Sequence, residues 1–129
     1  MKIEVSNGEI IDKHTILSIK LEKIKNEDKL KNIQKEYDTL TPHVNEIKSL
    51  ISEEEFEGLY NDLVIVNKKL WNTEDELRIL EKEKNFDSKF IDLARSVYHD
   101  NDNRAEIKKQ INIKTKSDLI EEKDYIKYK

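Results

Sequence analysis

Leu59 to Arg78 read LYNDLVIVNKKLWNTEDELR, and this stretch decides the fold. Its apolar residues recur every three or four positions, which is the spacing of one face of an α-helix. The pattern extends in both directions and predicts one long helix from about residue 53 to residue 84. The stripe expected to face the core consists of Leu59, Leu63, Val66, Leu70, Leu77 and Leu80.

A second long helix is predicted directly after the first. Asp87 is placed to cap it, and apolar residues keep helical phase across the polar run 100–103. We therefore expect one continuous helix over residues 87–112. The alternative is a break within the polar run, with Asn103 as a new N-cap. Because the connection is so short, the two helices must run antiparallel as a hairpin.

The N-terminus carries a helix-start signal. Ser6 and Glu9 have the spacing of a capping box, in which each side chain bonds the other residue's backbone amide. This predicts a helix over about residues 7–25. Residues 2–5 alternate polar and apolar, which suits a short strand before the helix.

Two further helices are expected before the hairpin. One covers about residues 27–39. Thr41 and Pro42 then look like a restart, with Thr as N-cap and Pro in the first helical position, which predicts a short helix over 42–51. At the other end of the chain, Ser117 is a candidate cap for a last short helix.

The composition supports a helical fold class. Two Gly and one Pro in 129 residues leave little for the turns that a β-rich fold needs. We expect an all-α protein, built as an antiparallel helical bundle around the hairpin 53–112. By length, residues 1–129 form a single helical domain.

Charge and composition exclude several function classes. A net charge of −4 argues against a general nucleic-acid binder, which needs a basic face. The absence of Cys excludes disulfides and thiolate metal sites. No apolar run approaches the length of a membrane span, and the first residues lack the apolar region of a signal peptide. The expected location is the cytoplasm, with no membrane partner.

A homo-oligomer is also expected. Apolar residues make up 36% of the chain and charged residues 40%, which is lean for a compact monomer. The helix 7–25 carries apolar residues outside its main stripe, at Ile11, Ile16 and Ile19. A helix of this kind is usually covered on more than one side. A second copy of the chain would supply such cover.

The candidate site is a polar stripe on the same long helix. Its members recur at 4-3-4 spacing from Asn67 to Arg78, beside the leucine stripe. The antiparallel partner helix brings a second polar set opposite the first. Arginine is rare in this lysine-rich chain and holds carboxylates in a fixed planar geometry. The predicted ligand-binding residues are Asn67, Trp71, Glu74, Asp75, Arg78, Asn101, Arg104 and Lys108.

Two interpretations of these residues remain open. In the first, they line a pocket that grips an anionic or sugar-like small molecule, with the indole as a flat apolar wall. In the second, they form a buried ion-pair network that fixes helix register in a structural or interaction module. Either way Arg104 needs a partner if it lies on the apolar face. We expect Arg104 or Arg78 to contact Glu74 or Asp75.

No metal or cofactor is predicted. A di-iron bundle requires Glu-x-x-His pairs, and the residues three positions before His14, His43 and His99 are not acidic. The chain also lacks a glycine-rich phosphate loop and a nucleophile with an adjacent base. No reaction can be assigned from these patterns.

Three segments carry a family resemblance: VSNGEIIDKHTILSIKL (5–21), LYNDLVIVNKKLWNTEDELR (59–78) and FDSKFIDLARSVYHDNDNRAEIKKQIN (86–112). Together they resemble a family of small uncharacterised proteins from bacteria and their phages, catalogued as a domain of unknown function. The segment from Asn67 to Arg78 also resembles a second uncharacterised family found near glycan-biosynthesis genes. These resemblances imply a carbohydrate context and mark the Trp/Glu/Asp/Arg and Asn/Asp/Arg segments as signatures, without assigning an activity.

Overall fold

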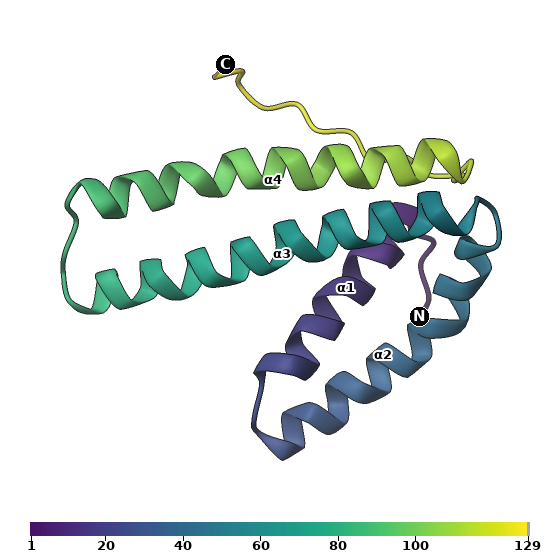
Figure 1. Cartoon of the computed structure of the whole chain (residues 1–129), viewed down its shortest axis with the longest axis horizontal. Coiled ribbons are helices and arrows are strands. Elements are labelled where there is room, and N and C mark those ends of the chain that lie inside the picture. The colour runs from purple at the N-terminus through teal and green to yellow at the C-terminus, as the bar shows by residue number, and fades with distance from the viewer. Residues whose placement is uncertain (129) are drawn as a thin grey trace.

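The structure, a computed structural model, describes residues 1–128. These residues contain four helices and no strand: α1 (Asn7–Lys23), α2 (Glu27–Lys48), α3 (Glu53–Lys82) and α4 (Ser88–Lys114). Helices α3 and α4 form a long antiparallel hairpin, and α1 with α2 forms a second hairpin packed across one end of it (Figure 1). The predicted all-α bundle with a long central hairpin is confirmed.

The helices start where side chains satisfy their free backbone amides. The hydroxyl of Ser6 accepts a hydrogen bond from the amide of Glu9 at 3.2 Å. The carboxylate of Asp87 accepts from the amide of Lys89 at 3.1 Å and so starts α4. An N-cap of this kind stabilises a helix by about 1 kcal/mol. The caps predicted at Ser6 and Asp87 are confirmed.

Helix α4 runs without a break through the polar run 100–103. The continuous helix is therefore confirmed, and a new cap at Asn103 is wrong. Helix α3 ends two residues earlier than expected, because Lys84 adopts a left-handed conformation with φ of 57°. The amide of Asn85 then bonds the carbonyl of Leu80 at 2.9 Å, which closes the helix as a Schellman motif.

The expected break within α2 is wrong. Pro42 lies inside one continuous helix, and Thr41 does not cap a new one. The hydroxyl of Thr41 instead donates to the carbonyl of Tyr37 at 2.8 Å. Beyond the proline, Val44 and Ile47 are buried in the core. Their burial holds the last turns of α2 in place and offsets the one backbone hydrogen bond that proline cannot make.

Two expectations for the chain ends are also wrong. Residues 2–5 form no strand, because no other strand in the described part of the chain offers a partner. Ser117 does not start a helix. Its hydroxyl accepts a hydrogen bond from the amide of Asn7 at 3.0 Å, so it caps the beginning of α1 across the fold.

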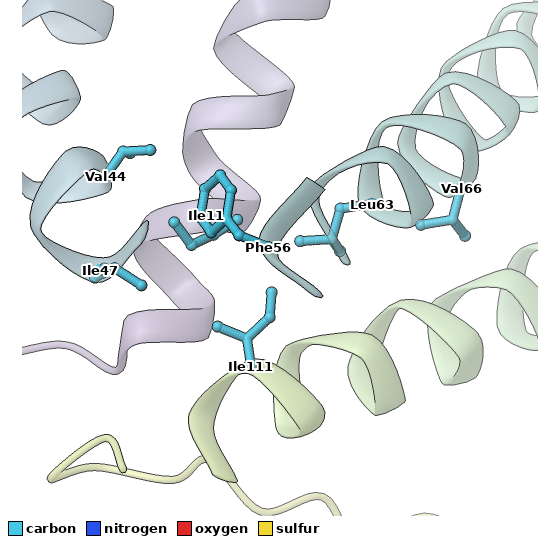
Figure 2. Close-up of a cluster of buried hydrophobic side chains, with 7 residues drawn as sticks. All are labelled: Ile11, Val44, Ile47, Phe56, Leu63, Val66 and Ile111. Atoms are coloured by element: carbon cyan, nitrogen blue, oxygen red, sulfur yellow. The ribbon is translucent and has the colours of Figure 1, made fainter. Parts of the chain in front are cut away.

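The core lies where the two hairpins cross (Figure 2). It draws on all four helices, which ties the second hairpin to the first. Full burial of each such side chain contributes about 1.5–3 kcal/mol. The cluster consists of Ile11, Val44, Ile47, Phe56, Leu63, Val66 and Ile111.

Helix α1 is the central element of the packing. It contacts α2, α3 and α4, so its apolar residues on several sides are covered within one chain. Ile11 and Ile19 are 1% and 2% exposed. These two isoleucines are therefore not available to a second copy, and the oligomer face expected on α1 is wrong at both positions.

Candidate functional site

An open groove of about 480 Å³ lies between α1, α3 and α4. We call it the Trp71 groove. Seven of the eight predicted site residues line it, and α1 adds Ile16 and Ile19 to its wall. The predicted residues that meet here are Asn67, Trp71, Glu74, Asp75, Arg78, Asn101 and Arg104. The hairpin thus brings together both polar sets, and Lys108 alone of the eight lies outside the groove lining.

A partly buried ion pair adjoins the groove, which Arg104 lines. Arg104 on α4 binds Asp12 on α1 through two hydrogen bonds, with Nε 3.0 Å from Oδ1 and the Nη2 nitrogen on Oδ2. The Asp12 side chain is 1% exposed. The hydrogen bond to Asp12 raises the pKa of Arg104 further, against the effect of burial. A bidentate pair of this kind fixes geometry as well as charge.

The partner of Arg104 corrects the expectation from sequence. That expectation placed Arg104 or Arg78 against Glu74 or Asp75, because it considered the hairpin alone. Arg78 meets it through Glu74, whereas Arg104 pairs with Asp12. In the fold α1 packs against both hairpin helices and presents Asp12 directly to Arg104. The buried carboxylate of Asp12 on α1 binds the Arg104 guanidinium in preference to the exposed acids of α3.

Asn67 joins all three helices at this point. Its side-chain amide nitrogen donates to Asp12 Oδ1 and to Thr15 Oγ1, both at 2.9 Å. The hydroxyl of Thr15 in turn donates to the backbone carbonyl of Asp12 at 2.7 Å. Asp12, Thr15 and Asn67 are all buried. The groove therefore has a rigid floor in which these polar atoms are already paired.

Lys108 belongs to a neighbouring cluster. Its ammonium donates to Glu9 Oε2 at 2.6 Å and lies 3.8 Å from Glu121 and 4.0 Å from Asp12. Burial raises the pKa of Glu9, but the hydrogen bond and charge of Lys108 outweigh it, so the pKa is lowered overall. Lys108 thus holds the start of α1 and the C-terminal segment on α4.

The rim of the groove is exposed to solvent. Glu74 and Arg78 lie 3.7 Å apart, one helical turn from each other, with side chains 53% and 80% exposed. The predicted contact between them is present, but it lies on the surface, where such a pair contributes at most about 1 kcal/mol. Asp75 is exposed and Trp71 is half-buried. The rim groups are therefore accessible to a ligand.

Among the charged side chains that line the groove, carboxylates outnumber the arginines that are free of a buried partner. Arg104 is neutralised by Asp12, since both of that carboxylate's oxygens bind the guanidinium. Arg78 then remains against two carboxylates, Glu74 and Asp75. The accessible part of the groove carries a net negative charge. This charge decides what class of ligand fits.

The contribution of α1 to the groove was missed from the sequence. Asp12, Ile16 and Ile19 follow i, i+4, i+7 spacing, so they share one face of α1. An aspartate on the same face as two isoleucines is the signal that was available. A carboxylate on an apolar face is buried only if it finds a cationic partner.

The described residues offer no metal centre. Across residues 1–128, no group of three or more His, Cys, Asp or Glu side chains is placed to hold a metal ion. Along the same stretch, every helix is too short or too polar to cross a lipid bilayer.

Comparison with known proteins identifies a family. The model of a family of unknown function, DUF6165, matches residues 1–128, and the chain belongs to this family. No curated protein and no solved structure matches the chain.

Proposed function

For this member of a family of unknown function, we propose that the Trp71 groove binds a neutral, sugar-like small molecule. The half-buried indole of Trp71 offers a flat apolar wall for the C–H face of a sugar ring. Glu74 and Asp75 accept hydrogen bonds from hydroxyl groups, and Asn101 both donates and accepts. An apolar surface with a few convergent polar groups is the usual form of a small-molecule site.

The charge of the groove carries the proposal. A ligand rich in phosphate would meet Glu74 and Asp75 with only Arg78 to compensate, because Arg104 is already paired with Asp12. Like charges in a partly enclosed groove disfavour each other. A polyhydroxylated neutral ligand has no such cost. The resemblance of residues 67–78 to a family found near glycan-biosynthesis genes supports the same ligand class.

Trp71 makes the proposal directly testable, since it is the only Trp in the chain. Its fluorescence should change on addition of glucose, galactose, mannose, N-acetylglucosamine or N-acetylgalactosamine. Isothermal titration of the same sugars measures affinity independently of the indole. Glucose 6-phosphate and UDP-glucose serve as anionic comparisons, and both are expected to bind more weakly than the best neutral sugar.

A pair of neighbouring variants provides the control. Asp75→Asn changes a groove carboxylate and should weaken sugar binding by roughly tenfold, the effect of losing one charge-assisted hydrogen bond. Glu76→Gln removes the same charge from the adjacent residue, which does not line the groove, and should leave binding unchanged. Equal effects of the two variants, or no sugar binding at all, would contradict the proposal.

A second candidate function is an interaction module that pairs with another copy of the chain. The protein exposes 9238 Å² of solvent-accessible surface, against about 7,200 Å² for a compact chain of 15.4 kDa. Two large apolar residues on the outer face of α3, Ile65 and Ile79, are 66% and 56% exposed. They lie two heptads apart and so share one face, which suits pairing between helices.

Light scattering tests this second candidate. The expected mass at micromolar concentration is a multiple of 15.4 kDa, and Ile65→Glu with Ile79→Glu should return it to one chain, because charges on this face would be buried unpaired. A monomeric wild-type protein would rule out self-association through α3.

A further inference from the structure

A second cavity, of about 630 Å³, lies beneath the C-terminal segment that follows α4. After Lys114 the chain turns back and runs over α4 on the side away from α3 (Figure 1). We call residues 117–128 the tail, and the space between them and α4 the tail cavity. Aromatic residues of both the tail and α4 line it.

Side-chain contacts hold the tail at both ends, and these contacts define the tail cavity. Near its start, Glu121 accepts a hydrogen bond from the hydroxyl of Ser6 at 3.3 Å and lies 3.8 Å from the ammonium of Lys108. Near its end, the hydroxyl of Tyr128 donates to the carboxylate of Asp102 on α4. The residues between these anchors span the cavity.

The two cavities adjoin along one ridge of α4. Val97 and Asn101 line both of them. These residues are one helical turn apart, a rise of about 6 Å at 1.5 Å per residue. By helical phase, Arg104 extends this face toward the Trp71 groove, while Tyr98 and Asp102 lie on the adjacent face under the tail. A ligand longer than one sugar ring would cross the ridge from one cavity into the other.

Like the Trp71 groove, the tail cavity combines aromatic rings with a few polar groups. Tyr98 and Tyr128 meet edge to face, with ring centroids 4.7 Å apart. The hydrogen bond to Asp102 raises the pKa of Tyr128 to about 12. Tyr125 is 73% exposed, and the ammonium of Lys123 lies 5.9 Å from its ring centroid. The charged residues in the cavity lining are Asp102 and Lys123, so the lining has no net charge.

We propose that the tail cavity is a second saccharide subsite, and that the ligand is an oligosaccharide spanning the ridge formed by Val97 and Asn101. Exposed tyrosine rings offer stacking surfaces, and the balanced pair of Asp102 and Lys123 offers an acceptor and a donor to hydroxyl groups. This inference rests on the proposed function of the Trp71 groove, because the first sugar unit lies there.

Chain-length dependence of binding tests the inference. Isothermal titration would compare N-acetylglucosamine with its β1,4-linked dimer to tetramer, and glucose with maltose to maltotetraose. Affinity is expected to rise at least tenfold between the monosaccharide and the trimer or tetramer in one of the two series. In Tyr125→Ala that gain should be lost, while the monosaccharide affinity stays unchanged. Tyr125→Phe keeps the ring and should keep the gain.

The controls separate this inference from the proposed function. Ile120→Ala alters the tail outside the cavity lining and should behave as wild type. Equal affinity at every chain length, or a gain that survives Tyr125→Ala, would overturn the second subsite. If Asp75→Asn still weakened monosaccharide binding, the Trp71 groove would stand. Absence of binding by every saccharide would overturn both.

Discussion

Replacing Gly8 by alanine is expected to destabilise the protein, because this glycine lies where α1 touches α4. A β-carbon there would come within 2.5 Å of the backbone carbonyl oxygen of Lys108 and 2.9 Å of the side-chain oxygen of Asn112. The same Asn112 oxygen accepts a 2.6 Å hydrogen bond from the Gly8 amide. The added methyl group would force the two helices apart and stretch that bond.

The magnitude follows from three contributions. Overpacking against a backbone atom costs about 1–3 kcal/mol. Weakening a buried hydrogen bond costs about 1 kcal/mol. Alanine's higher helix propensity stabilises α1 by up to about 1 kcal/mol, which offsets part of this loss. The free energy of unfolding should therefore fall by about 1–4 kcal/mol.

Gly58 provides the matched control, since it is the other glycine of the chain and also lies in a helix. A β-carbon at this position would meet nothing within 4 Å. Gly58→Ala should therefore stabilise the protein by about 0.5–1 kcal/mol. Urea unfolding followed by circular dichroism measures both variants. If Gly8→Ala were as stable as Gly58→Ala, the close contact between α1 and α4 would not exist.

Four further substitutions follow from the structure and use the same assay. Asp12→Asn removes the charge that neutralises Arg104 and should lower the free energy of unfolding by about 3 kcal/mol. Glu74→Ala breaks an exposed pair and should lower it by less than about 1 kcal/mol. Equal losses in the two variants would contradict this difference. Lys84→Gly relieves the left-handed conformation at the end of α3 and should stabilise by about 0.5–1 kcal/mol, and a loss would refute the Schellman ending. Burial lowers the pKa of His14 below its usual 6.5. The unfolded chain therefore binds more protons there, so the stability that neutral His14 contributes is present above pH 6.5 and is lost as the pH falls toward the folded-state pKa. His14→Gln should flatten this part of the stability profile, and an unchanged slope would show that another group causes it.

The long hairpin was predictable because its signals are local. Apolar residues at helical spacing, the Asp87 cap and a connection of a few residues leave an antiparallel pair as the outcome. Seven of the eight predicted site residues meet in one groove for the same reason, since they lie on facing sides of that pair. Lys108 lies farther along α4, where α1 and the tail surround it.

The break expected at Pro42 failed because local preference was overruled by burial. The residues that follow it, Val44 and Ile47, reach the core only if α2 continues in line. The oligomer face expected on α1 is wrong at Ile11 and Ile19 for a related reason. These two residues are covered by other helices of the same chain, which no periodicity within α1 could reveal.

By itself, the sequence determined most of the helical segments, where most of them begin, and which polar residues share a helix face. These properties depend on neighbours within a few positions along the chain. Only the tertiary structure decided that Arg104 pairs with Asp12, residues separated by 92 positions. That choice depends on which helix packs against the hairpin and on how deeply it buries each carboxylate. It left Glu74 and Asp75 unpaired with Arg104, and so gave the groove its negative charge.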